Sequence, residues 1–238
     1  MLMKILKHIN NIEIKPYLFP LSSMTVEQRY KVRDLLPDKC EVSFTNSEIN
    51  FYGEDYHKIK LEQFEDIYPG VKTYGISGTP ADCVLFAIHA LKIDFDTVFS
   101  GVNRGYNLGD DIVYSGTVAA AEEALMKGKR GVAVSCRYNT FDGLVYFDQV
   151  MEYILNHPLW NEQAVININI PVDAKGIKIT HQAKSSYRSY YTYDNGLYYS
   201  GVDVSIPHYN DLDGDLQTID DGYISISPLT FNKTDYNV

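Results

Sequence analysis

The stretch "FDTVFSGVNRGYNLGDDIVYSGTVAAAEEALMKGKRGVAVSC" (residues 95–136) contains a strand, a loop, a helix and a second strand, in that order. Residues 95–101 and 131–136 are short apolar runs that are typical of buried strands. Residues 115–128 have an alanine-rich helical pattern, and Gly128 stands where a helix ends. Two strands that are joined through a helix in this way lie parallel in one sheet.

The same alternation extends on both sides of this stretch. We expect further strands over residues 71–77 and 164–171, and helices over residues 79–93 and 143–157. The alternation predicts an α/β fold, with a Rossmann-like, mostly parallel sheet and helices on both faces. Ligands of such sheets bind beyond the carboxyl ends of the strands. The loop after residue 101 is therefore the expected functional site.

The last third of the chain has a different pattern. Residues 176–182, 185–193, 196–202 and 222–231 alternate like antiparallel strands, and "DNG" at 194–196 is a strong signal for a hairpin turn. The hairpin is aromatic on both strands and too long to be stable alone. We therefore expect a C-terminal β-rich arm that packs on a partner subunit or on another part of its own chain.

The whole chain, residues 1–238, is expected to form a single domain with three parts. Residues 1–70 are its N-terminal part, residues 71–173 its α/β core, and residues 174–238 its hairpin arm and C-terminal strand. Within the N-terminal part, residues 24–36 have the pattern of a helix.

Composition limits the classes of partner. The formal net charge of −10 argues against a nucleic-acid polymer or an anionic membrane as the main partner. The three cysteines (Cys40, Cys83 and Cys136) are widely spaced, which favours reduced, buried thiols over a disulfide framework. The N-terminus lacks the pattern of a signal peptide, and no run approaches the ~20 apolar residues of a membrane-spanning helix. We expect a cytoplasmic protein.

The loop and the helix that follows it carry the chemistry. Ser115, Gly116 and Thr117 open the helix, where free N–H groups and the helix dipole favour an anion. The alternative is an ordinary serine cap without a ligand. Asn103, Asn107 and the pair Asp110–Asp111 offer oxygen ligands suited to Mg²⁺, Mn²⁺ or Ca²⁺, and the alternative is an ordinary polar turn. The sequence has no P-loop and no dinucleotide-binding glycine motif.

Several segments resemble one family when they are taken in this order and at this spacing. They are "SGTPADCV" (residues 77–84), residues 100–125, "AVININIP" (residues 164–171) and "DLQTIDDGYISISPL" (residues 215–229). Together they resemble the survival-protein (SurE) family of metal-dependent nucleoside monophosphate phosphatases. The resemblance covers about the last two-thirds of the chain, and its central motif is long and specific.

The resemblance implies a SurE-like α/β fold, and a homodimer or homotetramer whose β arms are exchanged between subunits. It implies hydrolysis of nucleoside 5′- or 3′-monophosphates to nucleoside and phosphate, with a divalent cation, Mg²⁺ or Mn²⁺, as cofactor. In the family pattern, Asn103 corresponds to a metal ligand. Five residues fall around the phosphate: Ser115, Gly116, Thr117, Asn107 and Asp111. No catalytic residue is assigned.

The first 70 residues diverge from the family pattern. Members of the family have an Asp-Asp pair, within "TNDDG" after the first strand, as their principal metal ligands. In this chain no two aspartates are adjacent before Asp110, and Asn10 and Asn11 stand near the corresponding place. The alternative function is therefore that of a catalytically weakened relative, which binds nucleotides or acts as an oligomeric binding protein.

Overall fold

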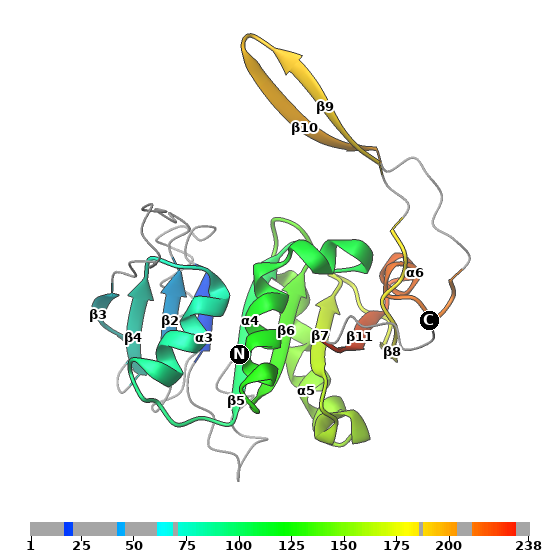
Figure 1. Ribbon diagram of the computed structural model, residues 1–238. Coiled ribbons are helices and arrows are strands. Elements are labelled where there is room, and N and C mark those ends of the chain that lie inside the picture. Colours follow the sequence, from blue (N-terminus) through cyan, green and yellow to red (C-terminus); the bar gives the residue numbers. More distant parts are fainter. Residues whose placement is uncertain are drawn as a thin grey trace, which may run out of the picture.

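A nine-stranded sheet forms the body of the protein, as the computed structural model in Figure 1 shows. The structure describes residues 17–20, 42–45, 61–68, 71–185, 188–203 and 211–231. The strand order is β3-β4-β2-β1-β5-β6-β7-β11-β8. The strands are Tyr17–Pro20 (β1), Val42–Thr45 (β2), Leu61–Tyr68 (β3), Val71–Ile76 (β4), Thr97–Arg104 (β5), Arg130–Cys136 (β6), Val165–Ile170 (β7), Ile177–Ile179 (β8) and Ile224–Leu229 (β11).

The centre of the sheet is parallel. The strands from β4 through β2, β1, β5 and β6 to β7 pair in parallel, whereas β3 and β11 pair antiparallel with β4 and β7. Among the described residues, the helices are Pro80–His89 (α3), Gly116–Met126 (α4), Phe147–Leu155 (α5) and Asp215–Asp220 (α6). In the same ranges, 3₁₀ turns cover Gly109–Tyr114 (η2), Asp142–Tyr146 (η3) and Pro158–Asn161 (η4). The predicted α/β fold class, with its mostly parallel sheet, is confirmed.

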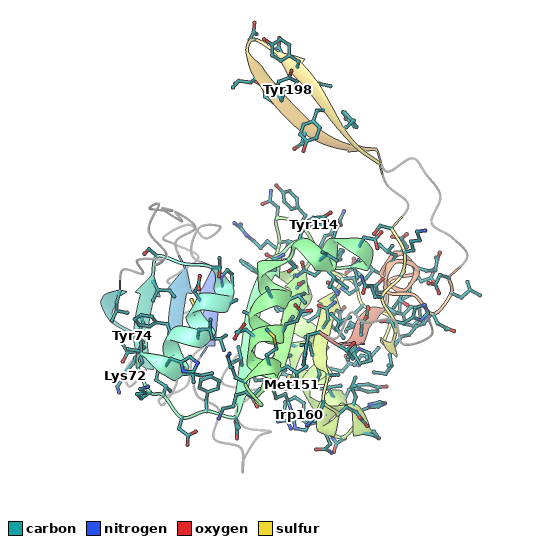
Figure 2. The ribbon with its side chains drawn as sticks, viewed as in Figure 1. Lys72, Tyr74, Tyr114, Met151, Trp160 and Tyr198 are labelled. Carbon is teal, nitrogen blue, oxygen red and sulfur yellow. The ribbon has the colours of Figure 1, made fainter. Side chains whose placement is uncertain are left out.

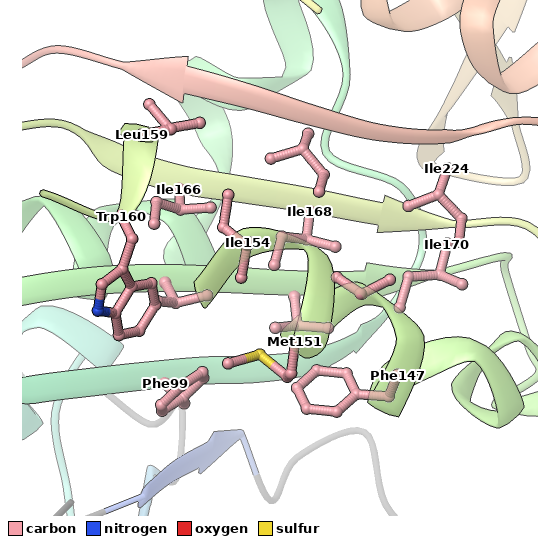
Figure 3. Packing of buried hydrophobic residues seen from close by; sticks show 14 of the residues in the cluster. Phe99, Phe147, Met151, Ile154, Leu159, Trp160, Ile166, Ile168, Ile170 and Ile224 are labelled. Carbon is pink, nitrogen blue, oxygen red and sulfur yellow. The ribbon is translucent and has the colours of Figure 1, made fainter. Parts of the chain in front are cut away.

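One face of the sheet packs against α5. Met151 and Ile154 of this helix are fully buried against alternate residues of the strands, among them Ile166 and Ile168 of β7, as Figure 3 shows. The helix shows apolar residues at helical spacing, which gives it the single apolar face that the sheet covers. This cluster is the largest of the apolar clusters among the described residues.

The opposite face packs against α3 and α4. Ala120, Ala121 and Ala124 of α4 are fully buried. The helix lies very close to β6, because a Cβ on Gly131 would come within 2.0 Å of the Ala121 carbonyl oxygen. The small side chains of α4 and the glycine on β6 allow this close packing of the helix on the sheet.

The last third of the chain divides between the sheet and the arm. Strands Arg188–Asp194 (β9) and Leu197–Asp203 (β10) form a separate antiparallel hairpin, which projects from the body in Figure 1. Asn195 and Gly196 have φ values of 49° and 85°, so the predicted hairpin turn is confirmed. β8 and β11, in contrast, join the main sheet rather than the arm.

Some elements differ from the sequence prediction. The expected helix over residues 79–93 ends at His89. Lys92 beyond it has a φ of 53°, a left-handed backbone conformation that is incompatible with a right-handed helix. The first turn of the helix expected over residues 143–157 is the 3₁₀ turn η3. Neither α6 nor β1 was predicted, and the helix expected over residues 24–36 lies outside the described residues.

Two expectations from composition can be compared with the structure. Cys83 and Cys136 are buried thiols, as expected, whereas Cys40 lies outside the described residues. Within the described ranges, no helix has the length and apolarity needed to cross a membrane.

Candidate functional site

The carboxyl ends of β4, β5 and β6 meet at one edge of the sheet, because these strands all run in the same direction. α3 begins after β4 with Thr79 as its N-cap, and α4 begins after the β5 loop with Ser115 as its N-cap. Both helix N-termini therefore lie at this edge, and Figure 2 shows Tyr114 at the start of α4. This is the edge at which the sequence predicts the site.

The N-terminus of α3 is closed by its own side chains. Asp82 Oδ2 accepts hydrogen bonds from Thr79 N at 2.7 Å and from Thr79 Oγ1 at 2.8 Å. Thr79 Oγ1 in turn accepts from Asp82 N at 3.2 Å, which completes a capping box. A carboxylate of the protein thus already occupies the place that an anion would take.

The N-terminus of α4 is built differently. Its first turn has no acidic residue, and Ser115 Oγ accepts only one bond of the turn, from Val118 N at 3.1 Å. The first intrahelical bond runs from Ala119 N to Ser115 O, so the N–H groups of Gly116 and Thr117 precede it. Among the described residues nothing accepts from these two N–H groups, which together with the positive end of the helix dipole suit an anion.

The side chains of these residues are packed into the protein. Thr117 is 6% exposed. A Cβ on Gly116 would lie 2.9 Å from Pro80 Cγ at the start of α3. A larger residue at position 116 would therefore disturb the packing of the two helices as well as the approach of a ligand.

Asn103 lies at the end of β5, at the same edge. Its Nδ2 donates to the carbonyl oxygen of Gly105 at 2.8 Å, which fixes the side chain against its own loop. This bond commits the amide nitrogen, so Oδ1 is the atom of the side chain that suits a cation.

Asn107 is 5% exposed and ties the loop to the sheet. Its Nδ2 donates to Ser135 Oγ at 2.6 Å, and its N–H donates to Asn169 Oδ1 at 2.8 Å. Its carbonyl oxygen accepts from Asn167 Nδ2 at 2.9 Å and Asn169 Nδ2 at 3.0 Å. These bonds give Asn107 a clear role in holding the loop, and its predicted role at the phosphate stays a prediction.

The two adjacent aspartates of the loop lie on η2 and are exposed. Asp110 Oδ2 accepts from Ser185 N at 3.1 Å, so this carboxylate faces the C-terminal part of the chain. The N–H of Asp111 donates to Leu108 O at 3.1 Å within the turn. The predicted role of Asp111 at the phosphate also stays a prediction.

The described residues do not complete a metal site. Asn103 offers a single neutral oxygen, and no group of three His, Cys, Asp or Glu residues that could hold a metal ion occurs in the described ranges. Hard divalent cations owe much of their affinity to charged oxygen ligands. Asn10 and Asn11, near the place of the family's Asp-Asp pair, lie outside the described ranges.

Comparison with known proteins decides the family. The family model described as "Survival protein SurE" matches residues 17–189. The chain belongs to the SurE family. The resemblance seen in the motifs is therefore confirmed.

SurE proteins from several bacteria are similar to most of this chain. A protein named 5′-nucleotidase SurE from Petrotoga mobilis is 37% identical over 194 residues, 75% of this chain and 75% of that protein. One of the same name from Carboxydothermus hydrogenoformans is 35% identical over 229 residues, 89% of this chain and 83% of that protein. The crystal structure of the SurE protein from Aquifex aeolicus has a TM-score of 0.72 at 25% identity, covering 95% of this chain and 96% of that one.

The structure adds two residues that sequence reasoning missed in this SurE chain. Tyr138 follows β6 and is 76% exposed. A Cβ on Gly105 would lie 3.7 Å from Asn103 Nδ2 and 4.0 Å from Tyr138 Cδ2, so the ring stands close to Asn103. Asp215 hydrogen-bonds to the loop from 106 residues away. Tyr138 follows the carboxyl end of a predicted strand, so its place at this edge could have been expected, whereas no local pattern could have placed Asp215 there.

Cys136, the last residue of β6, allows a test of how well the interior at this edge is shielded from solvent. Burial, followed by the nearby Asp142, raises the pKa of its thiol from 9.0 to about 12. Since the folded state holds this proton more tightly, the associated stability is present below pH 9 and is lost as the pH rises towards 12. We expect native protein treated with iodoacetamide at about pH 8 to leave the Cys136 peptide unmodified, because the thiolate is the reactive form.

Peptide mapping by mass spectrometry measures this modification. The same treatment in guanidinium should modify Cys136 fully, which serves as the control. Rapid labelling of Cys136 in the native protein would contradict its burial.

Proposed function

We propose that this SurE chain is a metal-dependent phosphomonoesterase that hydrolyses nucleoside 5′- or 3′-monophosphates to nucleoside and phosphate. The names of its relatives, 5′-nucleotidase SurE, support the substrate class. The observation that carries the proposal is the open N-terminus of α4 at the same sheet edge as Asn103. It would supply a phosphate site at the edge of the sheet where the family pattern places a metal ligand.

The backbone of α4 suits the phosphoryl group. The N–H groups of Gly116 and Thr117 would donate to two phosphoryl oxygens, and Ser115 at the N-cap lies at their side. These donors are fixed by the helix before the substrate arrives, so they stabilise charge on the phosphoryl oxygens without reorganisation. The overall charge of −10 does not oppose such binding, because the helix terminus acts within a few ångströms.

A divalent cation, Mg²⁺ or Mn²⁺, is part of the proposal. When bound, such an ion polarises phosphoryl oxygens. Asn103 Oδ1 would be one of its ligands, together with ligands from residues outside the described ranges.

The alternative of a catalytically weakened relative is less well supported. It rests on the missing Asp-Asp pair in the first 70 residues. The family match nevertheless includes residues 17–70, and the relatives that are similar to most of the chain carry an enzyme's name. The enzyme is therefore the function that we favour.

A panel of nucleoside 5′- and 3′-monophosphates tests the proposal. We expect release of inorganic phosphate with Mg²⁺ or Mn²⁺ and little release in EDTA. Asn103→Ala should lower kcat/KM by roughly 10- to 1000-fold, because loss of one well-placed stabilising group has effects of this order. Asn156→Ala, an exposed asparagine after α5 at the opposite edge, is the matched control and should be unchanged. Equal loss in the two variants, or activity that EDTA leaves intact, would contradict the proposal.

Tyr138 supports a nucleotide rather than a smaller phosphate ester as the substrate. Its exposed ring stands beside the Asn103 loop, where a base attached to the bound phosphate has an aromatic face to stack on. Tyr138→Ala should raise KM for a nucleoside monophosphate roughly 5- to 150-fold, since stacking of one base contributes about 1–3 kcal/mol.

Glycerol 2-phosphate, which has no base, provides the control substrate for this variant. Its KM should not change in Tyr138→Ala, and Tyr153→Ala on α5 should change neither KM. A similar rise for both substrates in Tyr138→Ala would mean that the tyrosine supports the phosphate site rather than the base.

We also propose that the protein is a homodimer or homotetramer that is joined through the β9–β10 hairpin. Tyr193 pairs with Tyr198 across the hairpin, and Tyr191 lies on the same face. All three are between 65% and 74% exposed, an aromatic surface that another copy of the chain would cover. Figure 2 shows Tyr198 far from the body of the protein.

Light scattering at micromolar concentration measures the assembly. We expect at least a dimer for the wild type and a shift towards monomer for the double variant Tyr191→Ser/Tyr198→Ser. Tyr138→Ala, which removes an exposed tyrosine outside the hairpin, should keep the wild-type mass. A monodisperse wild-type monomer would contradict this assembly.

A further inference from the structure

Two segments of the C-terminal part reach the loop of the candidate site. Residues 181–185 precede the hairpin, and residues 211–216 follow it. Both contact the start of η2, at Gly109 and Asp110. The loop between Asn103 and α4 is thus held from outside the α/β core as well as by Asn107.

The contacts at Asp110 come from the segment before the hairpin. Asp110 N donates to Ser185 Oγ at 2.8 Å, and Ser185 N donates to Asp110 Oδ2 at 3.1 Å. Gln182 Nε2 donates to the carbonyl oxygen of Gly109 at 2.9 Å. Gly109 has a φ of 51°, and a Cβ there would lie 2.5 Å from Ser185 Oγ, so the two segments approach as closely as a glycine allows.

Asp215 joins all of these segments through one carboxylate. It is fully buried, and its Oδ2 accepts from Gly109 N at 2.9 Å. Its Oδ1 accepts from Ala183 N at 3.0 Å and Leu216 N at 2.8 Å. Burial raises the pKa of this carboxyl, against the opposing effect of the three N–H donors and of His181. A buried carboxylate is stable only with such partners, so its geometry is strongly constrained.

The constraint extends to the phosphate site through the chain itself. Gly109 is the first residue of η2, and η2 ends at Tyr114, directly before the N-cap Ser115 of α4. Asn103 lies before the same loop. Displacement of Gly109 would therefore change the distance between Asn103 and the N–H groups of Gly116 and Thr117.

We propose that Asp215 is a positioning residue for the phosphate site: by holding Gly109 it keeps the N-terminus of α4 and Asn103 at the spacing that the substrate needs. This inference rests on the proposed function for its substrate, but its main measurement is the binding of inorganic phosphate. A displacement of about 1 Å in a positioned group is enough to lower the rate roughly 100-fold.

Asp215→Asn is the informative variant, because it preserves shape and removes one acceptor. Its amide NH₂ would face a backbone N–H, of either Gly109 or the Ala183–Leu216 pair. Asp211→Asn is the matched control: Asp211 Oδ2 contacts His181 Nε2 at 2.9 Å on the surface, and the bonds of the η2 loop do not involve its carboxylate. Ser185→Ala is a milder variant that loses only the acceptor for Asp110 N.

Three measurements, made at a temperature where each variant is folded, test the positioning role of Asp215. Hydrogen exchange of residues 109–118 should be faster in Asp215→Asn than in the wild type and unchanged in Asp211→Asn, with α5 unchanged in both. The dissociation constant of inorganic phosphate should rise at least ten-fold in Asp215→Asn. With nucleotide, kcat/KM should fall by at least as much. Ser185→Ala should raise the dissociation constant of inorganic phosphate a few-fold. If Asp215→Asn does not fold, the result for Ser185→Ala tests the proposal in its place.

The outcomes separate this inference from the proposed function. A wild type that binds phosphate but hydrolyses no nucleotide removes the proposed function, while the phosphate isotherms of the variants still test Asp215. Unchanged phosphate binding in Asp215→Asn, the same loss in Asp211→Asn, or exchange that rises uniformly over the protein would overturn the positioning role. A wild type that binds no phosphate would overturn both.

Discussion

Two fully buried asparagines on β7 hold the loop of the candidate site against the sheet. Asn167 and Asn169 on β7 have no access to water, and a buried amide is costly unless it is hydrogen-bonded. Both donate to the carbonyl oxygen of Asn107, and Asn169 also accepts from the Asn107 N–H. The loop after β5 is thus the partner that these strand residues require. Without it, both amide nitrogens would lose their acceptor, whereas Asn167 Oδ1 has no hydrogen-bond partner among the described residues even with the loop in place.

On the face of the sheet that carries Asn167 and Asn169, the residues change from apolar to polar towards the carboxyl ends of the strands. On β7, Val165 packs in the cluster under α4, and Asn167 and Asn169 follow it towards the carboxyl edge. On β6, Ala133 packs in that cluster, and Ser135 then accepts from Asn107. Apolar residues therefore hold the helix, and polar residues hold the loop that leads into it. The opposite face is apolar where α5 and the η3 turn before it pack on the strands.

The sequence predicts the fold better than it predicts the contacts of the site. The strand–helix alternation and the "DNG" turn are local patterns, and both gave the right elements. The alternation in "VININI" (residues 165–170) is typical of a strand with one face in water, yet all six residues are buried. The partner of the asparagines is about 60 residues away, and Asp215 is 106 residues from Gly109. Period and propensity carry no information on such pairs.

The contrast between α3 and α4 shows why long-range contacts belong at the site. The α3 terminus is closed by Thr79 and Asp82, three residues apart, so it is complete as soon as the helix forms. At the α4 terminus Ser115 caps only Val118 N, and within the described ranges no acceptor meets the N–H groups of Gly116 and Thr117. The loop before it is held by β7 and by the segments around the hairpin. At α3, a capping box holds the first turn in place. At α4, residues distant in the sequence hold the preceding loop instead, and the N-terminus of the helix can therefore accept an anion.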